Sequence, residues 1–386
     1  MRHFSTIFNQ ILAHVPRNQF NKAVKAFKAD RYVKKFTTWR QFTANLFAQI
    51  TGRDSLRGIT TALGVHINRW YHMGFGKVTR STLAHANKKR DYRVYENLFY
   101  KILQRCSDLT PKHKFQFKNP LYSLDSTTID LCLSIFPWAS FRKRKGAIKL
   151  HLLMDHRGEI PSFIVISEGK NSDIKIARET NLPLSPDSII AIDRGYTDYG
   201  WLWSLNLRKC FFVTRTKKDM AYRVIGQHEV RGRGVLADET IELTVPQSAA
   251  KYPDKMRVVT YLDEESEKVY CFLTNNFRLA ASTIAAIYKE RWQIEIFFKW
   301  VKQNLKIKTF IGTSQNAVMT QIWIAMIYYL LLAYIKYQTK FNRSLLELGR
   351  LLNEALFMNV VIIDLLSLDV SEVQRAIQDN AQMQFW

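Results

Sequence analysis

Residues 189–196 read Ile189-Ile190-Ala191-Ile192-Asp193-Arg194-Gly195-Tyr196. A short run of apolar, mostly β-branched residues predicts a strand that is buried on both faces of a sheet. The run ends in one acidic residue with a glycine close behind it, and ligand groups of open α/β sheets gather at such strand ends. Asp193 is therefore a candidate ligand of a cation, with the cap of a following helix as the alternative interpretation.

A second acidic residue interrupts a strand further upstream. Residues 121–132 are apolar and β-prone, and they contain Ser123-Leu124-Asp125-Ser126-Thr127-Thr128. A carboxylate without a partner inside a sheet costs free energy, and a bound cation would offset that cost. Asp125 is thus a second candidate ligand, although the serine and threonines that follow it also suit a turn or a cap.

The segments around these two strands predict an α/β fold. They alternate as three strands, helix, strand, helix and strand, which indicates a mixed sheet with helices on its faces. The strands are expected at 121–132, 148–154, 160–167, 188–192 and 210–216, and the helices at 173–180 and 199–205. Further strands, expected at 240–245, 256–262 and 268–274, indicate a β-rich insertion.

Helices are predicted on both sides of this sheet. Apolar positions recur at three- and four-residue spacing in several segments. These segments are 21–27, 38–50, 56–63, 93–103 and 281–305. Residues 54–71 contain a short helix, a glycine and a second segment with His66, Asn68, Arg69 and Trp70. That order suits a helix-turn-helix and an ordinary helical hairpin about equally.

An almost wholly apolar segment over 317–335 is about long enough to span a bilayer. Gln321 and the mixture of small and large residues also suit a helix in the centre of a soluble fold. Nothing else in the sequence resembles a membrane protein, so we expect a core helix and no membrane partner. The tail over 347–386 has six acids against two bases, which favours packing or self-association over DNA contact.

The chain carries a formal net charge of +24. Such an excess indicates a polyanionic partner, with nucleic acid first and an anionic membrane second. Residues 1–120 hold 23 Lys and Arg against 5 Asp and Glu, a net +18. Aromatic residues lie among these bases at Trp39, Trp70, Tyr71, Tyr92 and Tyr95. A basic coat that merely aids solubility is the alternative, but this part of the chain fits a phosphate-binding surface better.

The cysteines and the N-terminal residues predict a cytoplasmic protein. The four cysteines are widely separated and form no C-x-x-C pair, which predicts reduced, buried thiols rather than a zinc site. Residues 1–16 lack the continuous apolar run of a secretory signal. With a nucleic-acid partner, the expected location is the cytoplasm, in association with the nucleoid.

Glu295 lies within the predicted helix 281–305, where a solvated glutamate is the ordinary interpretation. The residues near Glu295 favour a functional role for it instead. Tyr288, Arg291, Glu295 and Lys302 fall at offsets 0, 3, 7 and 14, which places them on nearly one helical face. That face presents one carboxylate among groups that bind phosphate.

Three acids on different elements suit phosphodiester chemistry. Cleavage and transfer need an activated oxygen nucleophile and a stabilised leaving oxygen, and two divalent ions held by carboxylates supply both. Asp125, Asp193 and Glu295 are the candidates. Rival acids nearby are Asp130, Asp155, Glu159, Asp198 and Glu290. Strand alternation places Asp130 on the face opposite Asp125, and helix spacing turns Glu290 away from Glu295.

These motifs together resemble a known family. The pattern Y-x2-R-x3-E-x6-K over 288–302, preceded by D-R-G-Y at 193–196 and by an L-D-S-T strand at 124–127, closely resembles the transposases of bacterial insertion sequences, family four (IS-four). The resemblance covers the order of strands, insertion and helices from about Leu121 to Lys336. The N-terminal part, including Thr38-Trp39-Arg40-Gln41-Phe42, resembles less specifically the helical DNA-binding region of many members.

The resemblance implies an α/β fold with a ribonuclease-H-like mixed-sheet core, a β-rich insertion, an N-terminal helical region and a C-terminal helical extension. The implied bounds are 1–115 for the helical DNA-binding region, 116–220 for the first part of the core, 221–280 for the insertion, 281–340 for the last part of the core with Glu295, and 341–386 for the extension.

The family likeness also implies a metal-dependent DDE transposase. Asp125, Asp193 and Glu295 would be the catalytic metal ligands for two Mg²⁺ ions, with Mn²⁺ as a substitute. Contacts to DNA near the cleaved end would come from Tyr288, Arg291 and Lys302, with Arg194 as a weaker candidate. The implied partners are the inverted terminal repeats of the element and the target DNA. A homodimer on DNA is expected, because transposition holds both ends together.

In the expected reaction, water cleaves the element ends and the freed 3′ hydroxyl attacks target DNA. A two-metal nuclease that cuts without rejoining, such as a junction resolvase, is one alternative. A DNA-binding regulator descended from a transposase is another, although binding alone would not need three carboxylates. Some family members use a tryptophan of the insertion to receive a flipped base, and residues 221–280 contain none. Tyr261, Tyr270 or Phe272 could stack a base instead.

Overall fold

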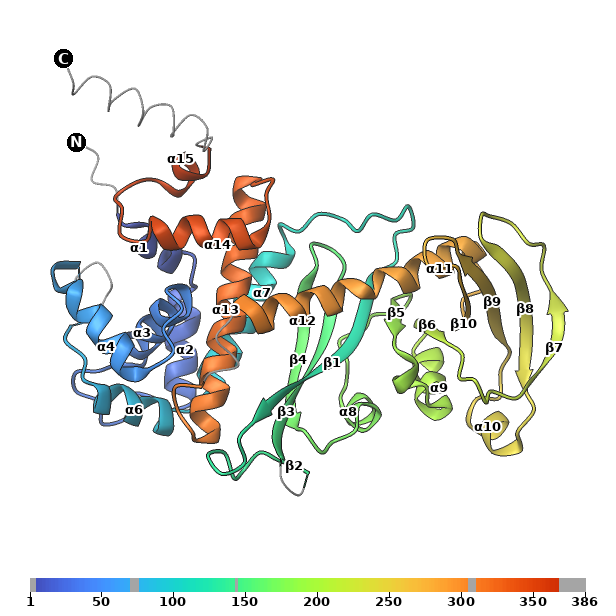
Figure 1. The fold of residues 1–386 in the computed structure, drawn as a ribbon, viewed down its shortest axis with the longest axis horizontal. Helices are drawn as coiled ribbons and strands as arrows, with labels where there is room; N and C mark the ends of the chain where they lie inside the picture. The colour runs from blue at the N-terminus through green and yellow to red at the C-terminus, as the bar shows by residue number, and fades with distance from the viewer. Residues whose placement is uncertain (1–4, 70–75, 143–144, 305–309, 368–386) are drawn as a thin grey trace, which may run out of the picture. The chain divides into compact units, whose positions relative to one another are not determined.

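The chain forms two compact units in the computed structural model, which describes residues 5–69, 76–142, 145–304 and 310–367 (Figure 1). A helical unit combines 1–110 with 303–386, and an α/β unit comprises 111–302. Trp70 and Tyr71, which the sequence singled out, lie outside the described residues.

The α/β unit is built on one mixed sheet, to which the described residues contribute ten strands. Their order is β2-β3-β1-β5-β6-β10-β9-β8-β7, and β4 also pairs with β3. The strands are β1 (Leu121–Leu131), β2 (Ser140–Arg142), β3 (Lys145–Asp155), β4 (Ile160–Glu168), β5 (Ile189–Ile192), β6 (Phe211–Arg215), β7 (Tyr222–Gln227), β8 (Val235–Leu243), β9 (Met256–Asp263) and β10 (Lys268–Thr274).

The first part of this sheet confirms the ribonuclease-H-like core. Strand β3 pairs antiparallel with both β1 and β4, whereas β5 runs parallel to β1 and to β6. The parallel register places Leu124 opposite Ile192. As a result, Asp125, in the middle of β1, lies beside Asp193, which directly follows the end of β5.

The β-rich segment continues the same sheet. Strands β7 to β10 form antiparallel pairs with one another, as expected for a meander of short strands. Strand β10 also pairs with β6, with Phe272 opposite Arg215. The sequence predicted three of these four strands but not their continuity with the core, because this pairing joins segments far apart in the chain.

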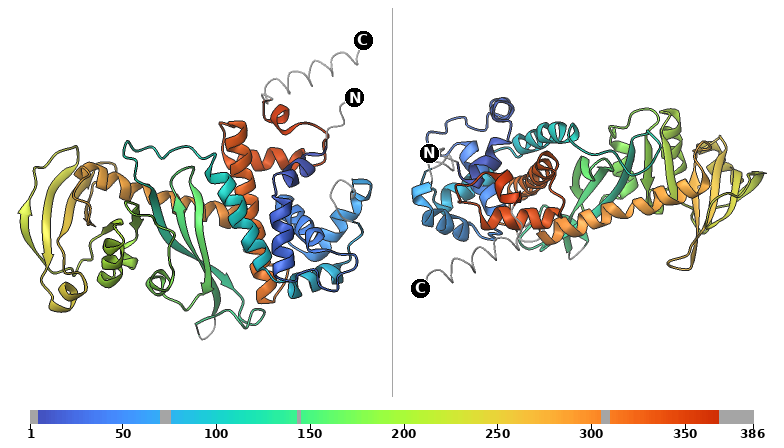
Figure 2. Two further views of the ribbon diagram at one scale, coloured as in Figure 1. Left: turned by 180° about the vertical axis from the view of Figure 1, so that it is seen from behind. Right: turned by 90° about the horizontal axis from the view of Figure 1, so that it is seen from above.

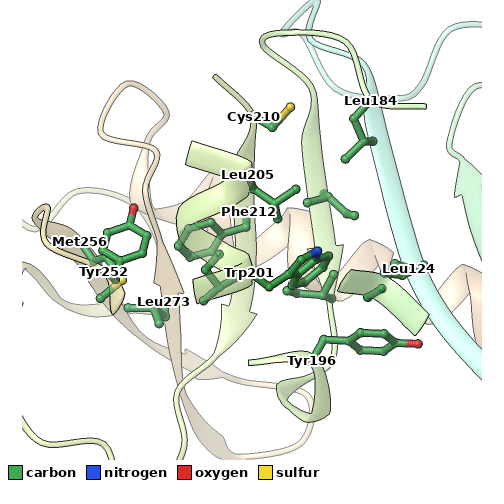
Figure 3. Close-up of a cluster of buried hydrophobic side chains, with 14 of the residues drawn as sticks. Leu124, Leu184, Tyr196, Trp201, Leu205, Cys210, Phe212, Tyr252, Met256 and Leu273 are labelled. Carbon is green, nitrogen blue, oxygen red and sulfur yellow. The ribbon is translucent and has the colours of Figure 1, made fainter. Parts of the chain in front are cut away.

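Helices cover both faces of the sheet. One face packs against α8 (Asp173–Glu179), α9 (Tyr199–Leu207) and α10 (Pro246–Lys251). Figure 3 shows side chains of this packed layer, including Phe212 of β6, Trp201 of α9 and Tyr252, which follows α10. The other face packs against α11 (Ala281–Glu290) through Ile189, Ala191 and neighbouring apolar residues. Consecutive residues of a strand point to opposite faces of the sheet, so the alternate residues of β5 pack against different helices.

The predicted helix 281–305 is two helices in the structure. Helix α11 ends at Glu290, and α12 (Trp292–Asn304) begins two residues later. Arg291 between them keeps helical dihedral angles, with φ −50° and ψ −29°. The two helices therefore continue in nearly one direction, and Figures 1 and 2 show them as one run along one side of the sheet.

The helical unit combines both ends of the chain. Its helices are α1 (Ile7–Ala13), α2 (Arg17–Ala26), α3 (Thr38–Ile50), α4 (Leu56–Val65), α6 (Arg80–Lys89), α7 (Arg93–Ser107), α13 (Gln315–Thr339), α14 (Leu345–Glu354) and α15 (Ile362–Ser367), with a 3₁₀ turn η1 (Ile67–Arg69) after α4. The sequence did not predict α6, whose mostly polar residues lack an apolar periodicity. The second segment of the suggested helix-turn-helix begins as η1 and then leaves the described residues.

Helix α13 is the centre of this unit. Among the described residues, α13 is the one helix that is both long enough and apolar enough to cross a membrane. However, 94% of its most apolar window is buried inside the protein. It packs against α3, α6, α7 and α14, and this burial agrees with the predicted core helix. The sequence placed 315–339 with the last part of the catalytic core, whereas the structure groups it with the N-terminal helices.

The cysteines are all free, as expected for reduced thiols. Cys106 and Cys210 are buried and Cys271 is partly buried. Cys132 is exposed, so the expectation that all four are buried was wrong. It lies just beyond the end of β1, where the chain leaves the sheet.

Candidate active site

Asp125 lies in the middle of β1, an interior strand of the sheet between β3 and β5. One carboxylate oxygen accepts the backbone N–H of Ser126 at 2.8 Å. Burial raises the pKa of Asp125 to about 6. The like charges of Glu295 and Asp193 push this pKa in the same direction. Its position in the strand thus buries the carboxylate, and a nearby positive charge is needed to stabilise the ionised form.

Asp193 follows β5 directly and begins the 3₁₀ turn η2 (Arg194–Tyr196). Its carboxylate accepts the N–H of Gly195 at 3.1 Å, so Asp193 caps this turn, as the alternative interpretation of the sequence predicted. The same carboxylate also approaches Arg215, at 3.6 Å from Oδ1 to Nη2. A cap and a ligand are compatible roles, because a carboxylate has several lone pairs to offer.

Glu295 lies in the first turn of α12. Its Oε1 accepts Nη2 of Arg291 at 2.6 Å, and Nη1 of the same arginine donates to Oδ2 of Asp125 at 3.0 Å. Arg291 therefore bridges the carboxylates of β1 and α12. The side chain of Arg291 is 9% exposed, so these charge-assisted hydrogen bonds are stronger than exposed ones.

One cavity of about 690 Å³ brings the acids together. Asp125, Asp193 and Glu295 all line it, together with Tyr288 and Arg291. The sequence predicted seven residues as metal ligands or DNA contacts, and five of these seven line this cavity. The lining does not include Lys302 or Arg194. Lys302 is half-buried in the last turn of α12, and Arg194 is exposed in η2.

The rival acids lie elsewhere. None of them lines this cavity among the described residues. Three have other partners: Glu290 is buried against Lys114, Asp155 pairs with Arg157, and Asp198 pairs with Arg178. Asp130 is exposed on β1. The spacing arguments that set Asp130 and Glu290 aside agree with these positions.

Arg215 is a site residue that the sequence interpretation missed. It ends β6, the strand beside β5, and its guanidinium lies 5.7 Å from the ring centre of Tyr288 and 5.9 Å from that of Tyr270. The rule that functional groups gather at strand ends, which identified Asp193, would also have identified Arg215 at the end of the predicted strand 210–216.

Aromatic residues form another part of the cavity wall. Tyr261, Tyr270 and Phe272 of the β-rich segment all line it, as does Trp292, which is 59% exposed at the start of α12. The sequence named the first three as candidates for base stacking and missed the fourth. An exposed tryptophan in a wall that also contains Tyr288 and Arg291 presents an aromatic face on which a base can stack.

Several buried donors at this cavity have no hydrogen-bond partner within the described residues. They are the hydroxyl of Tyr288 and the Nε atoms of Arg291 and Arg215. An unsatisfied buried donor costs about 1–3 kcal/mol, and a bound water or an oxygen of a bound molecule would supply the missing acceptor. All three lie on residues that line the carboxylate cavity.

The donor set fits a divalent cation of the Mg²⁺ class. Carboxylate oxygens are the ligands that Mg²⁺ and Mn²⁺ prefer, and burial makes the carboxylate of Asp125 costly without a positive charge. Among the described residues, no group of three acids, histidines or cysteines is close enough to hold a metal ion as it stands. Arg291 supplies the positive charge between Asp125 and Glu295 in this arrangement.

Comparisons with known proteins identify the family of this chain. Residues 116–331 match the family model described as the transposase DDE domain, and residues 3–76 match one described as a domain of unknown function (DUF4372). The chain is 31% identical over 280 residues to a Sinorhizobium fredii protein assigned as transposase y4zB, covering 71% of this chain and 76% of that protein.

Two further relatives belong to insertion sequences. One is assigned as the transposase of element IS5377 from Geobacillus stearothermophilus, with 28% identity covering 69% of this chain and 70% of that protein. The other is assigned as the transposase of element IS4SA from Synechocystis sp., with 27% identity covering 65% and 70%. The chain belongs to the DDE transposase family of insertion sequences, in the group of insertion-sequence family four.

Proposed function

We propose that this transposase binds the inverted terminal repeats of its element, cleaves the element ends, and joins the freed 3′ hydroxyl to target DNA. The observation that carries the proposal is the shared cavity of Asp125, Asp193 and Glu295, which come from β1, the end of β5 and α12. Carboxylates from three separate elements in one cavity suit metal-dependent phosphodiester chemistry.

The three carboxylates would hold two Mg²⁺ ions, with Mn²⁺ as a substitute. When bound, such ions supply the activation of water and the stabilisation of the leaving oxygen that in-line displacement requires. Asp125 and Asp193 are fixed by the sheet, so their separation is set before DNA binds. Glu295 lies in the first turn of α12 and completes the set from a helix.

Arg291, Arg215 and Tyr288 would bind the DNA around the cleaved bond. Arginine matches phosphate geometry through paired N–H donors, and each of these residues carries a buried donor without a partner. Tyr261, Tyr270, Phe272 and Trp292 line the same cavity, where they would stack on bases freed from the duplex. Lys302 and Arg194 remain candidates for DNA contacts outside the cavity lining.

The test replaces the three acids one at a time, as Asp125→Asn, Asp193→Asn and Glu295→Gln. Each variant should lose at least about 100-fold in Mg²⁺-dependent cleavage of a labelled element end, while it still binds that DNA. Asp130→Asn is the matched control, because Asp130 lies exposed on the same strand as Asp125. Wild-type cleavage in any one variant removes that residue from the site.

A pre-cleaved element end tests the joining step. The wild-type chain should insert its 3′ hydroxyl into target DNA, and hydrolysis products alone would instead indicate a nuclease. Transposition also requires both ends to be held together, so we propose a homodimer on DNA. Light scattering with and without paired ends measures this, and a single chain per two ends would contradict it. Association with the nucleoid follows from the proposed binding.

A further inference from the structure

A group of polar side chains lies on the face of the sheet opposite the carboxylate cavity. Residues of a strand alternate between the two faces. Asp125 points to the face that α11 covers, where it lines the cavity. Leu124 packs on the other face, in the layer of α8 and α9 (Figure 3). Ser126, which follows the proposed metal ligand directly, therefore belongs to that layer too.

Asp173, the first residue of α8, binds Ser126. Its Oδ1 accepts the hydroxyl of Ser126 at 2.8 Å. The same oxygen accepts Nζ of Lys149, a residue of β3, at 3.1 Å. Lys149 also donates to the carbonyl oxygen of Asn171, just before α8, at 3.1 Å. Lys149 thus fixes the start of α8 against the sheet, and Asp173 in turn fixes Ser126.

The charge of Asp173 is offset by this lysine. Nδ1 of His151 lies 3.7 Å from Oδ1 of Asp173, but burial lowers the pKa of His151 to about 4. Lys149, whose side chain is 16% exposed, is therefore the cation beside Asp173 at neutral pH. His151 lies directly across from Ser126 in the pairing of β1 with β3. The polar group therefore joins β1, β3 and α8.

The same group reaches the element that follows the second proposed metal ligand. Tyr196 ends η2, the turn that Asp193 caps, and its backbone N–H donates to the carbonyl oxygen of Asp193 at 2.9 Å. Tyr196 is buried, and it lines one small cavity together with His151 and Asp173. Asp173 thus lies against the residues that follow both Asp125 and Asp193.

We propose that Asp173 is a positioning residue for the metal site. It acts on Asp125 through the hydroxyl of Ser126, and it acts on the turn of Asp193 through Tyr196. This inference rests on the proposed function, because it takes the two aspartates as metal ligands. Asp173 is not itself a ligand, since it does not line the carboxylate cavity. Removing a partner that orients a metal ligand typically weakens metal binding by about 10- to 100-fold.

The test measures metal binding by the full chain without DNA. Mn²⁺ is titrated in, and the electron paramagnetic resonance signal of the free ion is followed. Ser126→Ala removes the hydroxyl and Asp173→Ala removes the carboxylate, so each should bind Mn²⁺ about 10- to 100-fold more weakly than the wild type. Affinity for a labelled DNA duplex should stay the same, because neither side chain lines the cavity.

A double variant tests whether the two residues act through one contact. If they do, Ser126→Ala/Asp173→Ala should bind Mn²⁺ no more weakly than the weaker of the two single variants. Independent losses would multiply instead, which would contradict action through Ser126. Ser126→Thr keeps the hydroxyl and should bind Mn²⁺ like the wild type.

Glu179→Ala is the matched control for Asp173→Ala. Glu179 lies at the other end of α8, where it pairs with Lys175 and both side chains are exposed. Its removal should therefore leave the Mn²⁺ affinity unchanged. Urea unfolding of each variant separates a loss of folded protein from a loss of metal affinity. If Asp173→Ala does not fold, the comparison of Ser126→Ala with Ser126→Thr decides.

Several outcomes overturn the inference. They are wild-type Mn²⁺ affinity in Ser126→Ala and Asp173→Ala, an equal loss in Glu179→Ala, and weak binding by Ser126→Thr. If Asp125→Asn loses the metal while both alanine variants keep it, only the positioning role is wrong. If Asp125→Asn binds Mn²⁺ as tightly as the wild type, the proposed metal site is wrong and the positioning role falls with it.

Discussion

The guanidinium of Arg291 donates to the carboxylate of Asp125 at 3.0 Å, although 166 residues separate the two in the chain. The same side chain donates to Glu295, four residues along, at 2.6 Å. One arginine therefore connects β1, an interior strand of the sheet, to the helix that carries the third acid. Without it, two partly buried carboxylates would face each other with no positive charge between them.

Replacing this arginine should disable the site. Arg291→Ala should reduce single-turnover cleavage of a labelled element end by about 100- to 1,000-fold, the usual effect of removing one preorganised donor at a reacting centre. Arg291→Lys should recover only part of the rate, because an ammonium cannot bridge two acceptors as a planar guanidinium does. Wild-type cleavage in Arg291→Ala would exclude a role for the bridge.

Metal binding should be measurable without catalysis. An ion that binds only the folded state raises its stability by about 2.7 kcal/mol at 100 times the dissociation constant. We therefore expect Mg²⁺ to raise the thermal unfolding midpoint of the wild type, and Asp125→Asn to lose most of that rise. Asp130→Asn, on the same strand, should keep it. An equal Mg²⁺ effect in Asp125→Asn would place the ion elsewhere.

The stability of the α/β unit should depend on pH through two histidines. Burial lowers the pKa of His151 and of His156 to about 4. Asp173 and Lys149 act on His151 with opposite signs, while His113 and Lys114 further lower the pKa of His156. Because both folded-state values lie below 6.5, the stability from the neutral rings is complete above pH 6.5 and is lost as pH falls toward 4.

Urea unfolding at several pH values measures this loss. Each histidine contributes up to about 1.4 kcal/mol per pH unit within the window. His156→Gln should remove about half of the dependence while preserving a hydrogen bond to the hydroxyl of Ser123, which lies 2.7 Å from Nε2 of His156. An unfolding free energy that stays constant between pH 6.5 and 4.5 would show that the rings are not buried as neutral groups.

A buried ion pair should hold the β-rich segment to the start of α11. Arg257 donates to both carboxylate oxygens of Asp238, at 2.7 and 2.6 Å, and also to the carbonyl oxygens of Asn276 and Leu279. Asp238→Asn should cost about 3–5 kcal/mol of unfolding free energy, because it leaves a buried guanidinium uncompensated.

An exposed pair on the same strand is the matched control for this change. Glu242 of β8 pairs with Arg223 at 3.1 Å, and both side chains are well exposed. Glu242→Gln should cost less than about 1 kcal/mol. The midpoint of urea unfolding measures both variants. Equal effects of Asp238→Asn and Glu242→Gln would contradict the proposed difference in burial.

Local patterns in the sequence predicted most of the elements. The apolar run that predicted 121–132 corresponds to β1, and the run ending at Asp193 corresponds to β5. Both signals come from neighbouring residues, so they need no knowledge of the fold. The same reasoning missed α6, which is mostly polar and which tertiary packing against α13 and α4 stabilises.

By itself, the sequence determined which acids interrupt apolar strands, which helix face carries a carboxylate beside a tyrosine, an arginine and a lysine, and where the basic charge lies. Only the tertiary structure decided which of these groups meet. Parallel pairing of β1 with β5 brings Asp125 beside Asp193, pairing of β10 with β6 extends the sheet past Arg215, and Arg291 joins β1 to α12. These contacts depend on burying both faces of one sheet, and periodicity within a segment carries no information about its distant partner.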